Sequence, residues 1–134
     1  MIGLETNVLV RALTGDDDVQ SPVARRFLES LTPDEPGFVS LVALVETLWV
    51  LRQHEPYRYT REQVYQVVDG LLRATTVVVE MADVVRSALA VARRTGREVP
   101  DALVASAGGH AGCDRTVTFD RRATAIPGMT LLGT

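Results

Sequence analysis

Four acidic residues occupy positions where a carboxylate calls for a physical explanation. Glu5 and Asp120 each come directly after a short run that is typical of a strand, and Glu46 and Asp101 fall in segments with helical periodicity. Carboxylates that share one pocket repel one another by several kcal/mol unless a cation neutralises them. If the fold brings the four together, the set predicts a site for a divalent cation.

Glu46 is the most informative of the four because its surroundings are apolar. On a helix, the residues three or four positions away from it are Val42, Ala43, Trp49 and Val50. We expect a carboxylate on such a face to be buried, where an unpaired charge costs several kcal/mol or shifts its pKa. It then needs a metal, a hydrogen-bond donor or a cation. A buried ion pair with an arginine is the alternative to a role in a site.

The other three acids each have a simple structural alternative. Glu5, and Asp101 after Pro100, can be first-turn acids stabilised by the helix dipole. Asp120 can cap a short helix that begins at Arg121. The argument for a site comes from the whole set, because a parallel α/β fold brings the carboxyl ends of its strands to one edge of the sheet.

The ligand chemistry of the set favours a hard cation. Oxygen ligands without a histidine or thiolate suit Mg²⁺ or Mn²⁺ rather than zinc. Such ions activate a water molecule and stabilise the charge that develops on a phosphoryl group. The residues alone therefore predict a metal-dependent phosphodiesterase. The remaining acids, among them Asp16 and Glu98, are expected to be solvated.

The elements that would position these acids alternate along the chain. We predict strands at 2–4, 37–40, 75–80, 116–119 and 130–132, and helices at 8–13, 21–31, 41–54, 60–72, 83–94 and 100–109. Ser21, Thr60 with Gln63, and Asp83 are expected to cap helices, and Gly96 to end one. Strands separated by helices predict an α/β fold, with a parallel sheet of four to five strands covered on both faces.

Composition excludes several classes of protein. The chain has 134 residues, 46% hydrophobic and 23% charged, which fits a single globular domain over residues 1–134. All fourteen basic residues are arginine, so chemistry that needs a Walker or Schiff-base lysine is excluded. The single cysteine, Cys113, permits no internal disulfide and is expected to be buried. With no signal-like or membrane-length apolar segment, we expect a cytoplasmic protein.

The net charge of −3 is a weak argument against a nucleic-acid partner. If a metal neutralises the four acids, however, the arginines outnumber the remaining acids by one. Arg52, Arg121 and Arg122 are among the arginines considered for phosphate contact, although a solvated surface is the better interpretation of any one of them. Trp49 and Leu51 are expected in the core.

Four sequence blocks resemble the PIN-domain ribonucleases, specifically the VapC toxins of bacterial type II toxin–antitoxin pairs. The blocks are MIGLETNVLVRAL, SLVALVETLWVLR, VPDALVASAGGHAGC and TVTFDRRA followed by Pro-Gly, and together they span essentially the whole chain. The resemblance implies a three-layer α/β/α sandwich, commonly a homodimer, and RNA cleavage by a metal-activated water. It also implies a VapB-type antitoxin partner whose tail occupies the active-site groove.

Carried over position by position, the resemblance assigns metal coordination to the acidic quartet. Glu5 and Asp101 match the family's metal ligands, and Glu46 and Asp120 complete the set, with Mg²⁺ or Mn²⁺ as the cofactor. The resemblance gives polar supporting roles to residues that orient the acids or a water, at Thr6, Asn7 and Thr118.

Glu5 departs from the family pattern, which has aspartate at this position. The extra methylene moves the carboxylate by roughly one bond, and a displacement of ~1 Å can cost on the order of a hundredfold in rate. Three explanations stay open: a natural variant that works, a weakened or non-catalytic member, and a substitution introduced because the active toxin harms its host.

Two other classes of protein compete with a nuclease. A phosphatase with an aspartyl nucleophile needs a second acid two residues later, where this chain has Asn7. A PIN-like binding module would pair with an antitoxin or RNA without cutting. Binding of Mn²⁺ or Mg²⁺ that Asp101→Asn abolishes would separate a catalytic site from a pure binding module.

Overall fold

The computed structural model describes residues 1–133, and within them it contains five short strands, six α-helices and one 3-10 helix. In chain order these are β1 (Ile2–Gly3), α1 (Thr6–Thr14), α2 (Gln20–Ser30), β2 (Gly37–Val39), α3 (Leu41–Gln53), α4 (Arg61–Arg73), β3 (Val77–Val79), α5 (Ala82–Thr95), α6 (Val99–His110), β4 (Thr116–Thr118), η1 (Arg122–Ala125) and β5 (Met129–Leu131). The predicted alternation of strands and helices is confirmed, with ends that differ by a few residues.

The strands pair in parallel but form two sheets in the described part of the chain. β1 pairs with β2 and β2 with β3, whereas β4 pairs with β5. The predicted α/β class is confirmed. The four to five strands expected in one central sheet are instead divided into sheets of three and two. Local sequence patterns identify strands, but they do not specify which strand edges meet.

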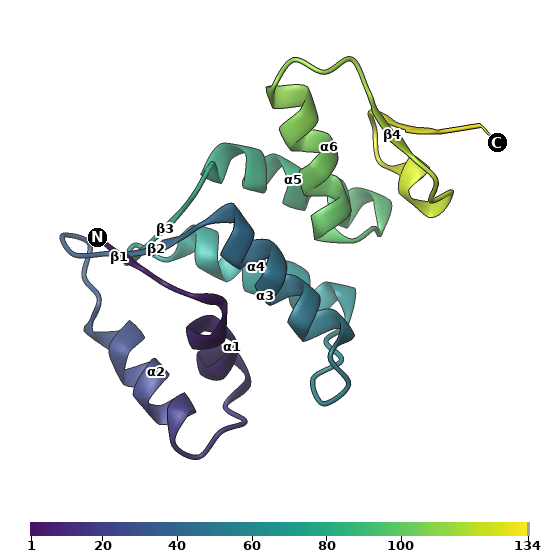
Figure 1. Cartoon of the computed structure of the whole chain (residues 1–134). Helices are drawn as coiled ribbons and strands as arrows, with labels where there is room; N and C mark the ends of the chain where they lie inside the picture. The colour runs from purple at the N-terminus through teal and green to yellow at the C-terminus, as the bar shows by residue number, and fades with distance from the viewer. Residues whose placement is uncertain (134) are drawn as a thin grey trace.

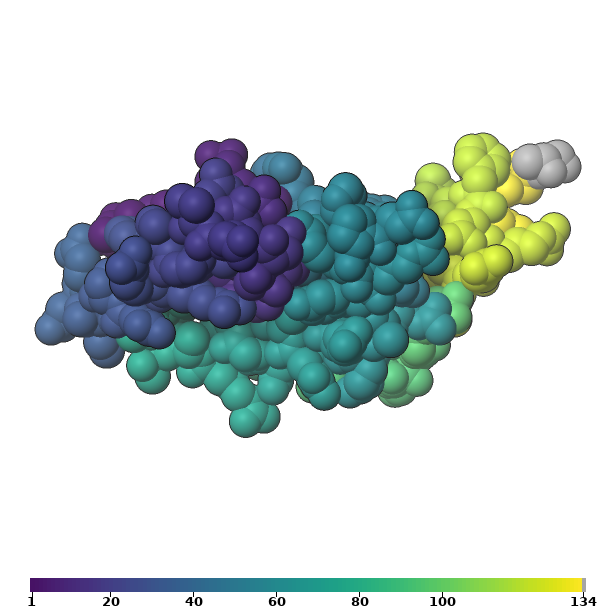
Figure 2. Space-filling model, turned by 90° about the horizontal axis from the view of Figure 1, so that it is seen from below, coloured from purple at the N-terminus to yellow at the C-terminus, as the bar shows by residue number. Residues whose placement is uncertain are grey.

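The two sheets lie at opposite ends of an elongated molecule. Figure 1 shows β1, β2 and β3 at one end and β4 with β5 at the other, with the helices α3 to α6 between them. In Figure 2 the C-terminal segment, coloured yellow, projects from the body of the molecule. This arrangement decides which of the predicted site residues can meet.

One hydrophobic cluster joins most of the elements. Its fully buried members include Leu44 of α3, Val68 of α4 and Val85 of α5, each 0% exposed. The cluster extends from Leu4, next to β1, to Ile126, between η1 and β5. Because Ile126 belongs to it, the C-terminal segment is anchored to the helical body. Among the described residues, no helix has the length and apolar character that a membrane crossing needs.

Two of the predicted helix ends are confirmed. The side chain of Thr60 accepts a hydrogen bond from the amide of Gln63 (3.1 Å), and the side chain of Gln63 accepts one from the amide of Thr60 (2.8 Å). This reciprocal pair is the predicted capping box at the start of α4. Gly96 ends α5 with a left-handed backbone (φ 67°), which glycine adopts without strain.

The other two predicted caps are wrong. Ser21 lies inside α2, and the side chain of Asp17 accepts the first amides of that helix instead. The hydroxyl of Ser21 accepts a hydrogen bond from the amide of Asp17, so the two residues close this turn together. α5 begins after Met81, which is in a left-handed conformation (φ 51°), and Asp83 lies in its first turn. There its negative charge interacts favourably with the helix dipole, but its side chain does not cap the helix.

Candidate functional site

Glu5 and its two polar neighbours lie where β1 leads into α1. Glu5 is the N-cap residue of α1, and its carbonyl accepts hydrogen bonds from the amides of Val8 (3.0 Å) and Leu9 (3.2 Å). Its backbone is extended and its side chain is exposed. Thr6 is half-buried, and Asn7 is exposed. The fold therefore presents the Glu5 carboxylate at the carboxyl end of β1, on the surface.

Glu46 lies on the exposed side of α3, so its predicted burial is wrong. Two of its apolar neighbours are exposed as well, Val42 by 69% and Trp49 by 49%, which also contradicts a core position for Trp49. Leu51 is buried as predicted. Glu46 takes part in no ion pair within residues 1–133, so the alternative of a buried pair with arginine is wrong too. A helix that is apolar on nearly every side does not reveal which face enters the core.

Two side chains hold the start of α3, next to the end of β2. Ser40 Oγ accepts a hydrogen bond from the amide of Ala43 (3.1 Å), and Glu80 Oε1 accepts one from the amide of Leu41 (2.8 Å). The amide of Glu80 donates to the carbonyl of Val39 (2.9 Å), which ties β3 to β2. The sequence analysis missed this role of Glu80. The available signal was an acid directly after a β-branched strand.

Asp101 lies in the first turn of α6, and a buried tyrosine fixes the chain just before it. The hydroxyl of Tyr65 donates toward the carbonyl oxygens of Arg97 (2.6 Å) and Ala92 (3.1 Å). Tyr65 is 4% exposed, and burial raises the pKa of its phenol. It thus remains a neutral donor that connects α4 with the end of α5 and the approach to α6.

An ion pair connects the last turn of α3 with the start of α6. Arg52 Nη2 and Nε lie 2.8 and 3.2 Å from Glu98 Oε1, and Nε lies 3.2 Å from Glu98 Oε2. Arg52 Nη1 also donates to the carbonyl of Tyr59 (3.2 Å). Glu98 was expected to be solvated, and Arg52 to be solvated or in contact with phosphate. The two side chains, each 27% exposed, instead position the turn that carries Asp101.

Asp120 follows β4 and is held by short-range hydrogen bonds. Its amide donates to Thr118 Oγ1 (3.0 Å), and its Oδ1 accepts from the amide of Arg122 (2.9 Å). Asp120 therefore caps the turn that becomes η1, as its structural alternative predicts. The cap uses one carboxylate oxygen, and the residue is exposed. Arg121 and Arg122 beside it are exposed as well.

Asp101 and Asp120 lie close enough for their charges to interact. Burial raises the pKa of the Asp101 carboxyl, the charges of Asp120 and Glu98 raise it further, and the guanidinium of Arg97 lowers it. Neither Glu5 nor Glu46 is among the described groups that shift this pKa. The structure thus brings two of the four predicted acids, together with an arginine, into one region.

The acids of a single copy of the chain do not fit a divalent cation as they are arranged. In residues 1–133, no group of three or more Asp, Glu, His or Cys side chains lies close enough to hold a metal ion. Carboxylates are suitable ligands for Mg²⁺ or Mn²⁺, so the chemistry of the donors agrees with such an ion. Their placement within one copy does not.

A groove of about 310 Å³ between α3 and α6 leads to Asp101. Val45 and Trp49 line it from α3, and Val104 lines it from α6. Asp101 is partly exposed in this groove. A ligand can therefore approach the carboxylate from the surface, past the indole of Trp49.

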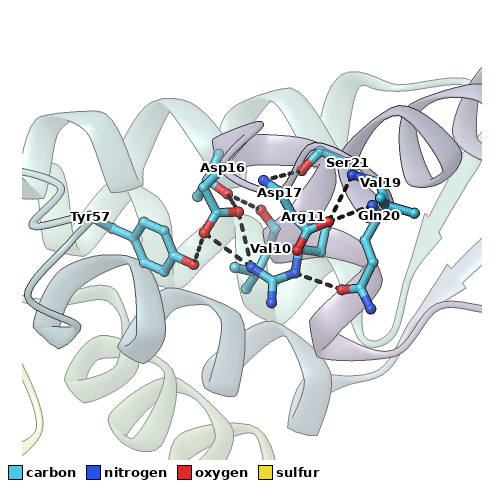
Figure 3. A network of polar contacts seen from close by, with 9 residues as sticks. Val10, Arg11, Asp16, Asp17, Val19, Gln20, Ser21 and Tyr57 are labelled. Atoms are coloured by element: carbon cyan, nitrogen blue, oxygen red, sulfur yellow. Dashed lines mark hydrogen bonds and ion pairs between the residues drawn. The ribbon is translucent and has the colours of Figure 1, made fainter.

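A separate polar cluster joins α1 to the loop after α3 (Figure 3). Arg11 donates to the carboxylate of Asp16 (3.0 and 3.1 Å) and to Gln20 (2.9 Å), and the hydroxyl of Tyr57 donates to Asp16. Hydrogen bonds from Tyr57, Thr14 and Arg11, in that order of importance, lower the pKa of Asp16 to about 2. Asp16 is exposed, as predicted, although its carboxylate is also hydrogen-bonded within the protein. Because these side chains satisfy one another, we assign the cluster a structural role.

The single cysteine is a further residue that was expected in the core and lies at the surface. Cys113 is free and exposed, so its predicted burial is wrong. It lies in the turn between α6 and β4, where its amide donates to the carbonyl of Gly108 (2.9 Å). In this turn, after the end of a helix, no layer of helices or strands covers the side chain of Cys113.

Comparisons with known proteins agree with the α/β architecture. The family model described as PIN domain matches residues 2–129. The chain is 26% identical over 119 residues to a VapC ribonuclease of Aquifex aeolicus (strain VF5), and the match covers 89% of this chain and 87% of the relative. A chain in a solved toxin–antitoxin complex from Klebsiella pneumoniae is 17% identical, with a TM-score of 0.39. The match covers 97% of this chain and 96% of the chain in that complex. That last likeness is too weak to carry an argument.

Proposed function

Because the chain belongs to the PIN domain family, we propose that it is an endoribonuclease and the toxin of a type II toxin–antitoxin pair. The observation that carries the proposal is the family match over residues 2–129. The likeness to a VapC ribonuclease along most of the chain supports RNA as the substrate.

The arrangement around Asp101 supports hydrolysis of a phosphodiester. In this reaction a water attacks phosphorus and a ribose oxygen leaves, so a base must accept a proton from the water. Asp101 and Asp120 supply two neighbouring carboxylates, and Thr118 orients the backbone of Asp120. Arg97 lies beside Asp101, and guanidinium groups match the geometry of phosphate oxygens.

We propose Mg²⁺ or Mn²⁺ as the cofactor and the quartet of Glu5, Glu46, Asp101 and Asp120 as its ligands, with Thr6 and Asn7 in supporting positions. PIN-domain nucleases generally depend on a divalent metal ion. When bound, such an ion stabilises negative charge on the phosphate. The described part of one chain does not bring three of these acids together. A complete metal site therefore needs at least one further ligand from outside this part of a single chain.

We also propose the partners that accompany this function. A VapB-type antitoxin would bind the chain and block the site, and the toxin would form a homodimer in the cytoplasm. The exposed groove between α3 and α6 that leads to Asp101 offers room for an antitoxin segment. Co-purification of the chain with a VapB-type antitoxin, and loss of RNA cleavage in that complex, would test this part of the proposal.

An RNA cleavage assay with matched variants tests the proposed activity. We expect cleavage with Mg²⁺ or Mn²⁺ and none with excess EDTA. Asp101→Asn and Asp120→Asn should each lower the rate by about a hundredfold or more. Asp34→Asn, which changes an exposed loop acid, should leave it unchanged. Wild-type cleavage by a folded Asp101→Asn variant would contradict the assigned role.

A second candidate function is binding without cleavage. The observations that favour it are the longer side chain at Glu5 and the absence of a group of three acids within residues 1–133 of one chain. A binding module would retain RNA or antitoxin without cutting RNA. Cleavage by the chain as given would exclude this function, whereas cleavage by Glu5→Asp alone would assign the loss of activity to the longer side chain of Glu5.

A further inference from the structure

Four strand edges in the described chain have no strand neighbour, at β1, β3, β4 and β5, and those of β1 and β4 are termed the two open edges. β1 is the end strand of its sheet, and the amides of Ile2 and Leu4 donate to carbonyls on the β2 side (2.9 Å each). In a parallel ladder alternate residues point to opposite sides, so the amide of Gly3 faces the open edge. β4 pairs with β5 alone, and the amide of Thr116 donates to the β5 side (2.7 Å). By the same alternation, Val117 presents its amide to the open edge of β4.

Apolar surface accompanies both open edges. A groove of about 520 Å³ runs between β1, α1 and α2, and Leu4, Val23 and Phe27 line it. On the other sheet, Val117 is 50% exposed and Phe119 is 70% exposed. An open strand edge flanked by exposed apolar side chains is a template for pairing with another strand.

The accessible surface of the molecule is large enough to leave room for a partner. It measures 7883 Å², whereas a compact monomer of 14.6 kDa exposes about 6,900 Å². The excess of about 1,000 Å² compares with the ~800 Å² that each partner buries in a protein–protein interface of standard size. The excess is thus of the size that one copy buries in a stable dimer.

The C-terminal strands are held away from the β1 of their own chain. The turn after α6 is closed by hydrogen bonds from the amides of Gly112 to Gly109 (3.0 Å) and of Cys113 to Gly108 (2.9 Å). β4 approaches α6 so closely that a Cβ atom on Gly108 would lie 2.9 Å from Thr116 Oγ1. β4 and β1 lie at opposite ends of the molecule (Figure 1). A second copy can supply the missing strand without breaking these contacts.

We propose that two copies of this chain pair reciprocally, with β4 of each copy adding in parallel to the open edge of β1 of the other. The addition places Asp101 and Asp120 of one copy at the carboxyl end of the other copy's β1, where Glu5 lies. Each copy has both edges, so a two-fold axis closes the assembly and leaves neither edge open. This completion of the acidic site rests on the proposed nuclease function, whereas the strand pairing itself does not.

Cross-linking tests the strand pairing without reference to activity. In a Cys113→Ser background, Gly3→Cys places a thiol on the β1 edge and Val117→Cys places one on the β4 edge. A Cβ on Gly3 meets no described atom within 4 Å, and Val117 is half exposed, so both changes should preserve the fold. With a short bis-maleimide, the double variant should give a covalent dimer, and sedimentation velocity should show a dimer before cross-linking.

The control replaces Gly3→Cys with Asp83→Cys, whose side chain is fully exposed at the start of α5. This pair should give little covalent dimer. An internally cross-linked monomer from the Gly3 and Val117 pair would show that the strand returns to its own chain, and would overturn the proposal. A monomer in sedimentation, or equal dimer yields from both pairs, would overturn it as well.

Complementation tests the shared site. Co-expressed Glu5→Gln and Asp120→Asn chains should recover up to about a quarter of wild-type cleavage, since half of a random mixture is heterodimer with one intact site of two. Co-expressed Asp101→Asn and Asp120→Asn chains should recover none, because every site keeps one lesion. Recovery in the second mixture, or none in the first, would overturn the shared site. If the wild type cleaves no RNA, the proposed function fails while cross-linking still decides the pairing.

Discussion

Replacing Arg52 by glutamine removes three guanidinium–carboxylate contacts with Glu98, at 2.8, 3.2 and 3.2 Å, and one hydrogen bond to the carbonyl of Tyr59. Each side chain is 27% exposed, which lies between a surface pair and a buried pair. Exposed pairs contribute about 0.2–1 kcal/mol, and breaking a buried pair costs about 3–5 kcal/mol. We therefore expect a coupling free energy of about 1–2 kcal/mol.

A double-mutant cycle measures this coupling. The free energy of unfolding in urea is determined for the wild type, Arg52→Gln, Glu98→Gln and the double variant. The matched control is the pair of Arg58 and Glu55, which has one contact at 3.1 Å and side chains 70% and 84% exposed. Its coupling should stay below about 0.5 kcal/mol. A coupling between Arg52 and Glu98 no larger than that of the control would refute the reasoning.

The same variants test whether the ion pair positions the site. Glu98 immediately precedes α6, and Asp101 lies in the first turn of that helix. At a temperature where all variants are folded, Arg52→Gln should lower RNA cleavage by about tenfold or more, because a small displacement of a catalytic group is costly. The fall should lie in kcat rather than KM. Arg58→Gln should leave both constants unchanged.

Three further predictions follow from individual residues. Glu5→Asp should give RNA cleavage equal to or greater than that of the wild type, and lower cleavage with folding intact would contradict the assignment of Glu5 as a displaced ligand. The pKa of Asp16 is lowered to about 2 from its ordinary value near 3.8, so the stability it contributes is present above pH ~3.8 and is lost as the pH falls toward 2. Asp16→Asn should therefore unfold more easily at pH 6, and urea titrations should show the difference shrink below pH 4 and disappear only below the folded pKa of about 2; a constant difference would contradict the hydrogen-bonded carboxylate. Leu44→Ala, at a side chain that is 0% exposed, should cost about 2–5 kcal/mol of unfolding free energy, whereas Val42→Ala, at a side chain that is 69% exposed, should cost under about 0.5 kcal/mol. Equal costs by calorimetry would contradict the described orientation of α3.

Local features of the fold could be predicted because short-range chemistry controls them. Thr60 and Gln63 form a capping box, and Gly96 ends a helix, since each requires only neighbouring residues. Ser21 failed as a predicted cap because Asp17 accepts the amides at the start of α2, and Asp83 failed because α5 begins earlier, after Met81. The family resemblance rested on blocks of this local kind, and the PIN domain match agrees with it.

The site could be predicted as a set of residue types but not as a geometry. Glu46 looked buried because its helix is apolar on nearly every side, and only packing shows which face meets the core. The partnership of Arg52 with Glu98 joins residues far apart in the sequence, and each alone resembles a solvated charge. Nothing in the sequence distinguishes Glu80, which holds the start of α3, from the other acids that follow strands.

The sequence by itself determined the order of strands and helices, the parallel α/β class, and the positions of Glu5 and Asp120 at strand ends. It could do so because hydrophobic periodicity and turn chemistry act over a few neighbouring residues. Only the tertiary structure decided that β4 lies away from β1, and that the charge of Asp120 acts on Asp101 while that of Glu5 does not. Strand edges are alike in backbone chemistry, so their pairing depends on how the intervening helices pack, which no local pattern encodes.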